Sequence, residues 1–143
     1  MFNRKKSWLD WLRLPATLAY MASVLLMSSI PGVIPDDASG LQGFFGWVAP
    51  SIQNLMHIPV YAGLAVLWCW TLELCLTRFW RTAGACLIAI CFGVLDEWFQ
   101  SFIPGRYASV NDILANALGA GVGVCAYSYL WVGTRRKSNR NNE

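Results

Sequence analysis

The sequence predicts an all-α membrane protein, a bundle of four transmembrane helices with both termini in the cytoplasm. Three observations lead to this fold class. Of the 143 residues, 56% are hydrophobic and only 13% are charged. Four apolar segments each have roughly the 17–25 residues that a helix needs to cross about 30 Å of hydrocarbon. Most Lys and Arg residues lie in the two tails and between spans two and three, and in a four-span bundle these segments are all on the same side of the membrane.

The four spans are expected at about Leu14–Ile30, Ile52–Leu76, Trp80–Phe102 and Asp112–Gly133. Together they form a membrane domain over 14–133. Residues 1–13 are expected to lie at the cytoplasmic interface, with Trp8 and Trp11 near the headgroups. A cleaved signal peptide is the less favoured interpretation of the first segment, because Asp10 and these tryptophans interrupt its basic and apolar parts. The tail 134–143 is basic and polar, and we expect it to be cytoplasmic and disordered.

Basic residues orient the bundle. Ten of the eleven Lys and Arg residues lie before the first span, between spans two and three, or after span four: Arg4, Lys5, Lys6, Arg13, Arg78, Arg81, Arg135, Arg136, Lys137 and Arg140. The positive-inside bias therefore places both tails in the cytoplasm and leaves only Arg106 outside. The net charge of +3 is then a topology signal, and no nucleic-acid partner is predicted.

Two further features have structural interpretations. The aromatic segment 41–48 is too short to span and is expected to lie along the outer interface or to fold as a lid, the anchor being favoured. The five cysteines fall within the spans without a C-x-x-C pair, so they are interpreted as core residues. No metal site and no cofactor is predicted.

The functional prediction rests on polar residues at the outer ends of spans two, three and four. Each charged group near the bilayer centre costs roughly 2.5–3.5 kcal/mol on insertion scales, so several together indicate a site. The candidate binding residues are His57, Tyr61, Asp96, Glu97, Gln100, Arg106, Ser109, Asp112 and Asn116.

Helical spacing places these residues on shared faces. Asp96, Glu97 and Gln100 are separated by three and four positions. On span four a polar stripe through Asp112 and Asn116 continues as Gly119-x-x-x-Gly123, a spacing that lets a neighbouring backbone approach closely. The polar half of this stripe should therefore face the bundle interior.

Each candidate also has a purely structural interpretation. Ser109-x-x-Asp112 is a capping box ahead of an apolar run. Asp96 and Glu97 could be solvated at a helix end, and Arg106 could pair with either of them. Glu73, near the inner end of span two, is expected to pair with a cytoplasmic cation such as Arg78.

At these residues the sequence resembles the VanZ-like family of small bacterial membrane proteins. The resemblance is carried by His57-x-x-x-Tyr61-x-x-Leu64, by Ser28-Ser29-Ile30-Pro31, and by Asp96-Glu97-x-x-Gln100-x-x-x-Pro104-Gly105-Arg106-x-x-Ser109-x-x-Asp112-x-x-x-Asn116-x-x-Gly119. The family often has an Asp-Lys pair ahead of the histidine, where this sequence has Gln53-Asn54.

The resemblance implies a multi-pass protein of the bacterial cytoplasmic membrane with a role in the envelope. The family's namesake is associated with low-level resistance to the glycopeptide teicoplanin. The expected function is therefore an extracytoplasmic polar pocket that binds the headgroup of a membrane lipid or of lipid-linked cell-wall material. Two alternatives remain open. One is an enzyme on a lipid-linked substrate, with Asp96 or Glu97 as general base and His57 assisting. The other is a structural or partner-binding membrane protein.

Overall fold

The computed structural model describes residues 8–31, 40, 50–106 and 108–140, and for 50–54 and 131–140 it describes the backbone alone. The aromatic segment 41–48, expected to be an anchor or a lid, lies outside the described residues.

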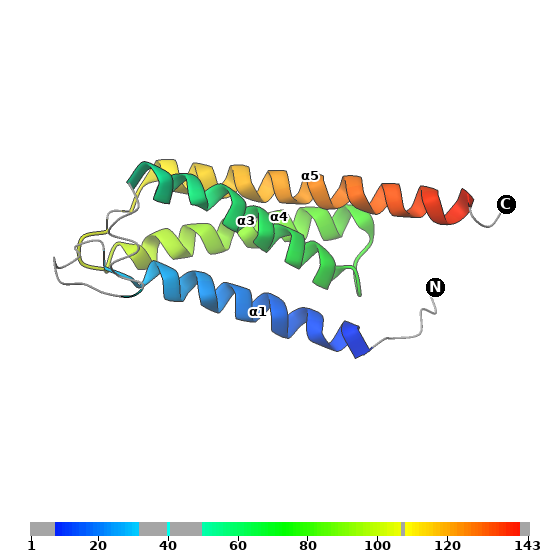
Figure 1. Ribbon diagram of the computed structural model, residues 1–143, viewed down its shortest axis with the longest axis horizontal. Helices are drawn as coiled ribbons and strands as arrows, with labels where there is room; N and C mark the ends of the chain where they lie inside the picture. Colours follow the sequence, from blue (N-terminus) through cyan, green and yellow to red (C-terminus); the bar gives the residue numbers. More distant parts are fainter. Residues whose placement is uncertain (1–7, 32–39, 41–49, 107, 141–143) are drawn as a thin grey trace.

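Four helices account for nearly all of the described residues, and none of these residues forms a strand. They are α1 (Trp8–Ser28), α3 (Pro50–Leu72), α4 (Arg78–Gln100) and α5 (Val110–Arg140). All four are long and apolar enough to cross a membrane, which confirms the prediction of a multi-pass all-α protein. Successive helices run in opposite directions, so the start of α1 and the end of α5 lie at the same end of the bundle (Figure 1).

The helix ends differ in part from the predicted ones. α1 begins at Trp8, so the segment ahead of Leu14 is continuous with the first span. α3 ends at Leu72 rather than Leu76. The tail that the sequence predicts to be disordered is helical as far as Arg140. That prediction is wrong because polarity excludes the tail from the hydrocarbon but does not prevent a helix from continuing into water.

The side chains are distributed as a bilayer requires. Large apolar residues of every helix are exposed, including Leu26 at 70%, Leu55 at 63%, Leu87 at 64% and Leu118 at 58%. Among the buried described residues, polar and charged side chains outnumber apolar ones. This is the reverse of a water-soluble protein and matches a bundle whose outer surface faces lipid and whose interior holds the polar groups.

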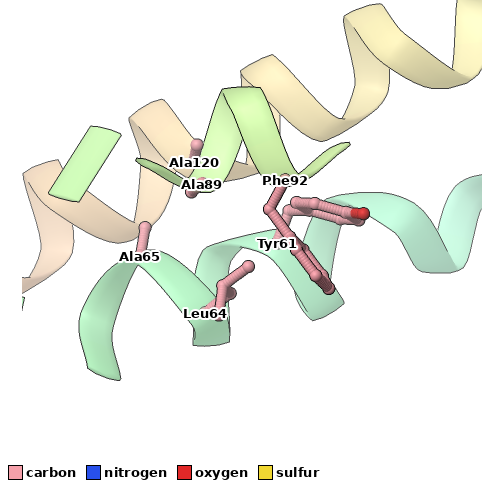
Figure 2. Packing of buried hydrophobic residues seen from close by; sticks show 6 residues of the cluster. All are labelled: Tyr61, Leu64, Ala65, Ala89, Phe92 and Ala120. Atoms are coloured by element: carbon pink, nitrogen blue, oxygen red, sulfur yellow. The ribbon is translucent and has the colours of Figure 1, made fainter. Parts of the chain in front are cut away.

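The apolar core is small and lies where α3, α4 and α5 meet (Figure 2). Tyr61 and Leu64 of α3 face Phe92 of α4, and alanines fill the remaining positions on all three helices. α1 packs on the outside of this core against α3 and α4. The bundle therefore depends on close helix approach more than on large interlocking side chains.

The close approach of α3 and α5 depends on two glycines, as the small-x-x-x-small spacing predicts. A Cβ atom on Gly119 would collide with the carbonyl oxygen of Ile58, and one on Gly123 would collide with that of Ala62. The polar stripe ahead of Gly119 consequently faces the bundle interior, where Asp112 and Asn116 are buried.

The cysteines do not all lie in the core. Cys69 is buried and Cys86 is half-buried, but Cys75, Cys91 and Cys125 are exposed, and all five are free thiols. The prediction of core residues is therefore wrong for these three, because a thiol is small and apolar enough to face lipid as readily as a neighbouring helix.

Candidate functional site

Polar side chains from three helices and one turn meet at the end of the bundle where α4 turns into α5. We call this group the α4–α5 cluster: His57, Tyr61, Asp96, Glu97, Gln100, Arg106, Ser109, Asp112 and Asn116. His57, Arg106 and Ser109 are half-buried and the others are buried. The structure thus brings together all the residues singled out from the sequence, although their helices are far apart along the chain.

One chain of hydrogen bonds runs from the core to the turn. The Tyr61 hydroxyl donates to Asp96 Oδ2 at 3.1 Å, and Gln100 Nε2 donates to the same oxygen at 3.2 Å. Gln100 Nε2 also donates to Ser28 Oγ of α1 at 3.2 Å. The amide oxygen of Gln100 then accepts from Arg106 Nε at 3.2 Å and from Nη2 at 2.9 Å. Because its nitrogen is held by Asp96 and Ser28, Gln100 presents its oxygen to Arg106.

The bonding partner of Arg106 is not the one that the purely structural interpretation offered. That interpretation pairs Arg106 with Asp96 or Glu97, but among the described residues Arg106 bonds to the neutral amide of Gln100. Asp96 is only 1% exposed, with Oδ2 occupied by Tyr61 and Gln100. The guanidinium therefore stays at the surface of the cluster, where Gln100 bonds both to it and to Asp96.

A second group of contacts surrounds His57. Its Nδ1 atom lies 2.8 Å from Asn116 Oδ1 and 3.9 Å from Glu97 Oε1. The other oxygen of Glu97 accepts a hydrogen bond from the backbone N–H of Ser109 at 3.2 Å. One ligand atom each from His57, Glu97 and Asp112 lies within 4.8 Å of the others. These three are the described residues that could hold a metal ion together.

Adjacent carboxylates on α4 thus serve different partners. Asp96 faces Tyr61 and Glu97 faces His57, because successive residues of a helix point about 100° apart. Spacing alone grouped both with Gln100, but the structure bonds only Asp96 to it.

The capping box predicted at the start of α5 is half right. Ser109 Oγ accepts from the backbone N–H of Asn111 at 3.1 Å, as an N-cap side chain does. In the motif the Asp112 side chain would also accept a hydrogen bond from the backbone N–H of Ser109. Here that N–H donates to Glu97 of the preceding helix instead. The Asp112 carboxylate is therefore not used on its own helix terminus and lies beside His57 and Glu97.

Gly93 makes room for the cluster, although the sequence did not single it out. A Cβ atom there would lie 2.9 Å from Asn116 Cβ and 3.1 Å from Tyr61 Cε1. α5 and α3 can therefore bring these two side chains against α4. Its signal was available as a glycine one turn from Asp96 and Glu97, inside an apolar span.

Three buried polar atoms of the cluster have no hydrogen-bond partner among the described residues. They are Asp96 Oδ1, Glu97 Oε1 and Asn116 Nδ2. A buried polar group without a partner is destabilising by roughly 1–3 kcal/mol, and more when it is charged. Such atoms are uncommon in folded proteins, and bound water, an ion or a ligand accounts for some of them.

A second polar cluster lies at the opposite end of the bundle and was not predicted. Arg13 bonds to Asp10 at 2.9 Å, to Glu73 at 3.3 Å and to the carbonyl of Trp70 at 2.7 Å. Glu73 also lies 3.8 Å from Arg81 and accepts from the Tyr127 hydroxyl at 3.0 Å. We call these residues the Glu73 cluster.

The sequence analysis counted Arg13 and Arg81 among the cytoplasmic cations that flank the spans, yet Arg13 is 4% and Arg81 is 2% exposed. Glu73, expected to pair with Arg78, pairs with Arg13 and Arg81. The Glu73 cluster connects all four helices and leaves charges balanced, which is typical of a structural network. It differs in this from the α4–α5 cluster, whose carboxylates outnumber their cationic partners.

One groove lies at the opposite end of the bundle from the α4–α5 cluster, between the start of α4 and the second half of α5. Its lining is mainly apolar: Arg78, Phe79, Thr82, Val124, Cys125 and Ser128. The members of the α4–α5 cluster instead pack directly on one another, and Arg106 is the half-buried cation at its edge.

The sequence model of the family described as VanZ/LLP1 matches residues 10–132, which is most of the chain. Neither a curated protein nor a solved structure matches it. The matched region covers nearly all of the four spans and contains every residue of the α4–α5 cluster.

Proposed function

The chain belongs to the VanZ/LLP1 family, and from this premise we propose that its α4–α5 cluster binds an anionic headgroup. The ligand is a membrane lipid or a lipid-linked envelope molecule at the extracytoplasmic side of the bacterial cytoplasmic membrane. Arg106 contacts the phosphate or carboxylate of the headgroup, and the buried residues behind it hold the guanidinium in position.

The observation that carries the proposal is the state of Arg106. It is half-buried and bonds to the uncharged oxygen of Gln100, with no ion pair to a carboxylate among the described residues. A guanidinium has five N–H donors in a planar fork that matches phosphate and carboxylate oxygens. Only part of this fork is used by Gln100, so an anionic ligand can take the rest.

The place of Arg106 in the bundle supports the same ligand. It comes directly after Gly105, a glycine with a positive φ of 76° in the turn that follows α4. Span ends lie at the level of lipid headgroups. The positive-inside bias puts this end on the extracytoplasmic side, where lipid-linked cell-wall material is exposed.

The hydrogen bonds behind Arg106 make it a prepared binding group. Asp96 and Ser28 orient Gln100, and Gln100 orients the guanidinium. A side chain already held in its bound geometry loses less conformational entropy when the ligand arrives. The carboxylate of Asp96 also favours the cation without meeting it directly.

Lipid binding to the purified full-length chain tests this proposal. The detergent-solubilised protein is titrated with phosphatidylglycerol or with zwitterionic phosphatidylcholine, and bound lipid is counted by native mass spectrometry. We expect a preference for phosphatidylglycerol that Arg106→Gln weakens about tenfold to a hundredfold, since a charged hydrogen bond contributes about 1.5–3 kcal/mol. Arg78→Gln, at the other end of α4, is the matched control and should bind as the wild type does.

The proposal is wrong if folded Arg106→Gln protein retains the full preference for phosphatidylglycerol.

A cellular experiment follows from the resemblance to the family's namesake. Expression in a susceptible bacterium should raise the teicoplanin concentration needed to stop growth, and Arg106→Gln should abolish that increase.

A reaction on a lipid-linked substrate is the second candidate function. The observation in its favour is Glu97 Oε1, which is buried 3.9 Å from His57 Nδ1 and has no hydrogen-bond partner in the described part of the chain. A carboxylate so placed can accept a proton from a hydroxyl or a water. The test is incubation with a bacterial lipid extract, followed by mass spectrometry of the lipids. A product that Glu97→Gln abolishes would establish a reaction, and unchanged lipids would exclude it for that extract.

A purely structural role makes a different prediction. If the polar residues only lock the helices together, Asp112→Asn and Asn116→Ala should lower the free energy of unfolding, and any folded fraction should bind lipid normally.

A further inference from the structure

His57, Glu97 and Asp112 form a compact set of potential ligands at the centre of the α4–α5 cluster. They come from α3, α4 and α5, and one ligand atom of each lies within 4.8 Å of the other two. Ligands bound about 2.0–2.2 Å from one metal ion are roughly 3–3.6 Å apart in tetrahedral or octahedral geometry. A movement of the ligand atoms by about an ångström would therefore let all three coordinate one metal ion.

Glu97 gives a second and independent indication. Its side chain is 1% exposed, and Oε1 has no hydrogen-bond partner among the described residues. This oxygen points toward His57, since it lies 3.9 Å from the Nδ1 atom. A buried carboxylate oxygen that faces an imidazole, with no donor among the described residues, has a free position for a further partner such as a metal ion.

The charges of the cluster point the same way. Asp96, Glu97 and Asp112 are all buried, and Arg106 bonds to Gln100 rather than to any of them. His57 is the cationic candidate facing Glu97 within 4.0 Å. Buried carboxylates are stable when they are paired or when they coordinate a metal, so a divalent cation would offset the excess negative charge.

We propose that His57, Glu97 and Asp112 bind a divalent metal ion of the Zn²⁺ or Mn²⁺ class. One imidazole nitrogen with two carboxylates is a donor set that suits these ions better than Mg²⁺ or Ca²⁺, which prefer oxygen ligands alone. Three protein ligands leave at least one position for water or for an oxygen of a bound ligand. The proposal goes beyond headgroup binding and does not depend on it.

Neighbouring residues supply the outer contacts that such sites require. Asn116 Oδ1 contacts His57 Nδ1, and the backbone N–H of Ser109 holds the second oxygen of Glu97. In metal sites these outer partners set the histidine tautomer and orient the carboxylate.

The wild-type experiment uses the full chain with any affinity tag removed. After chelation, Zn²⁺, Mn²⁺, Mg²⁺ and Ca²⁺ are added singly and bound metal is measured by elemental analysis. We expect equimolar Zn²⁺ or Mn²⁺ and little of the other two. X-ray absorption of the zinc-loaded protein should show imidazole scattering and oxygen ligands. Because the chain contains a single histidine, an imidazole signal identifies His57. A sulfur shell, or metal bound without imidazole, would overturn the proposal.

Variants separate this site from its surroundings. Asp112→Asn and His57→Gln should each weaken binding of Zn²⁺ by about tenfold or more. Asp96→Asn is the matched control, since Asp96 is also buried but faces Tyr61 and Gln100, and it should bind Zn²⁺ as the wild type does. Unchanged binding by folded Asp112→Asn protein would contradict the proposal. Where a variant does not fold, the absorption spectrum of the wild type decides.

Arg106→Gln should lose headgroup binding and retain the metal, so the two proposals can fail separately.

Discussion

The carboxylate of Glu97 caps the helix that follows its own: its Oε2 atom accepts the backbone N–H of Ser109 at 3.2 Å. Ser109 in turn caps Asn111 through its side chain. A buried acidic residue near the end of α4 thus fixes where α5 begins. Asp112 and Asn116 follow in the first two turns of α5.

Replacing Glu97 should therefore loosen the start of α5. Glu97→Gln retains an oxygen that can accept from Ser109, whereas Glu97→Ala removes the acceptor. We expect Glu97→Ala to lower the free energy of unfolding by about 1–2 kcal/mol relative to Glu97→Gln, the usual size of a cap. Hydrogen exchange measured by mass spectrometry should become faster over residues 109–113 in the alanine variant alone. Equal exchange in the two variants would show that Glu97 does not cap α5.

The Tyr61 hydroxyl should matter to Arg106 although the two do not touch. Tyr61→Phe removes one of the two donors to Asp96 Oδ2, and a hydrogen bond to a charged group contributes about 1.5–3 kcal/mol. Asp96 then holds Gln100 less firmly, so phosphatidylglycerol binding should weaken together with stability.

Tyr20→Phe is the control for that variant, because its hydroxyl donates to the carbonyl of Val60 at 2.9 Å, outside the cluster. It should cost about 0.5–1.5 kcal/mol and leave lipid binding unchanged. Equal lipid binding by Tyr61→Phe and Tyr20→Phe would show that Asp96 does not position Arg106.

The contact between α3 and α5 should be sensitive at alternate glycines. A Cβ on Gly119 would collide with the carbonyl of Ile58, which is backbone and cannot move aside, whereas a Cβ on Gly121 meets nothing within 4 Å. Gly119→Ala should destabilise the bundle by about 1–3 kcal/mol or more, as overpacking does. Gly121→Ala should be neutral or slightly stabilising, because alanine has the higher helix propensity. Unfolding in detergent measures both, and equal stabilities would contradict the packing.

The Glu73 cluster predicts different effects for two arginines one turn apart. Arg81 is 2% exposed, near Glu73 and over the ring of Tyr127, whereas Arg78 is exposed. Arg81→Gln leaves the half-buried carboxylate of Glu73 with less compensation and should cost about 1–3 kcal/mol. Arg78→Gln should cost at most about 1 kcal/mol. Unfolding free energies measured in detergent would contradict the cluster if the two variants matched.

The lengths and spacing of residues along the sequence were sufficient to predict the four helices and to predict that the candidate site residues meet at one end of them. Apolar length predicted four spans, and the stripe from Asp112 to Gly123 predicted which face of the last helix points inward. These patterns are local to one helix, so a single sequence displays them. The nine candidate residues meet because all of them lie at the same end of antiparallel helices.

Partner identities could not be predicted, because they depend on how helices rotate against one another. That rotation brings Arg106 within hydrogen-bond distance of Gln100 and Ser109 within hydrogen-bond distance of Glu97. It also packs Gly93 against Asn116. The burial of Arg13 was missed for another reason. Hydropathy treats a charge as the end of a span, yet Asp10 and Glu73 let this cation remain inside the bundle.

The measurement that bears most directly on headgroup binding is an experimental high-resolution structure in a bilayer nanodisc containing phosphatidylglycerol. The account predicts density for a phosphate group with an oxygen about 2.7–2.9 Å from the Arg106 guanidinium, while Gln100 still holds its Nε and Nη2 atoms. A guanidinium turned inward onto Asp96, Glu97 or Asp112, with no lipid beside it, would contradict the account.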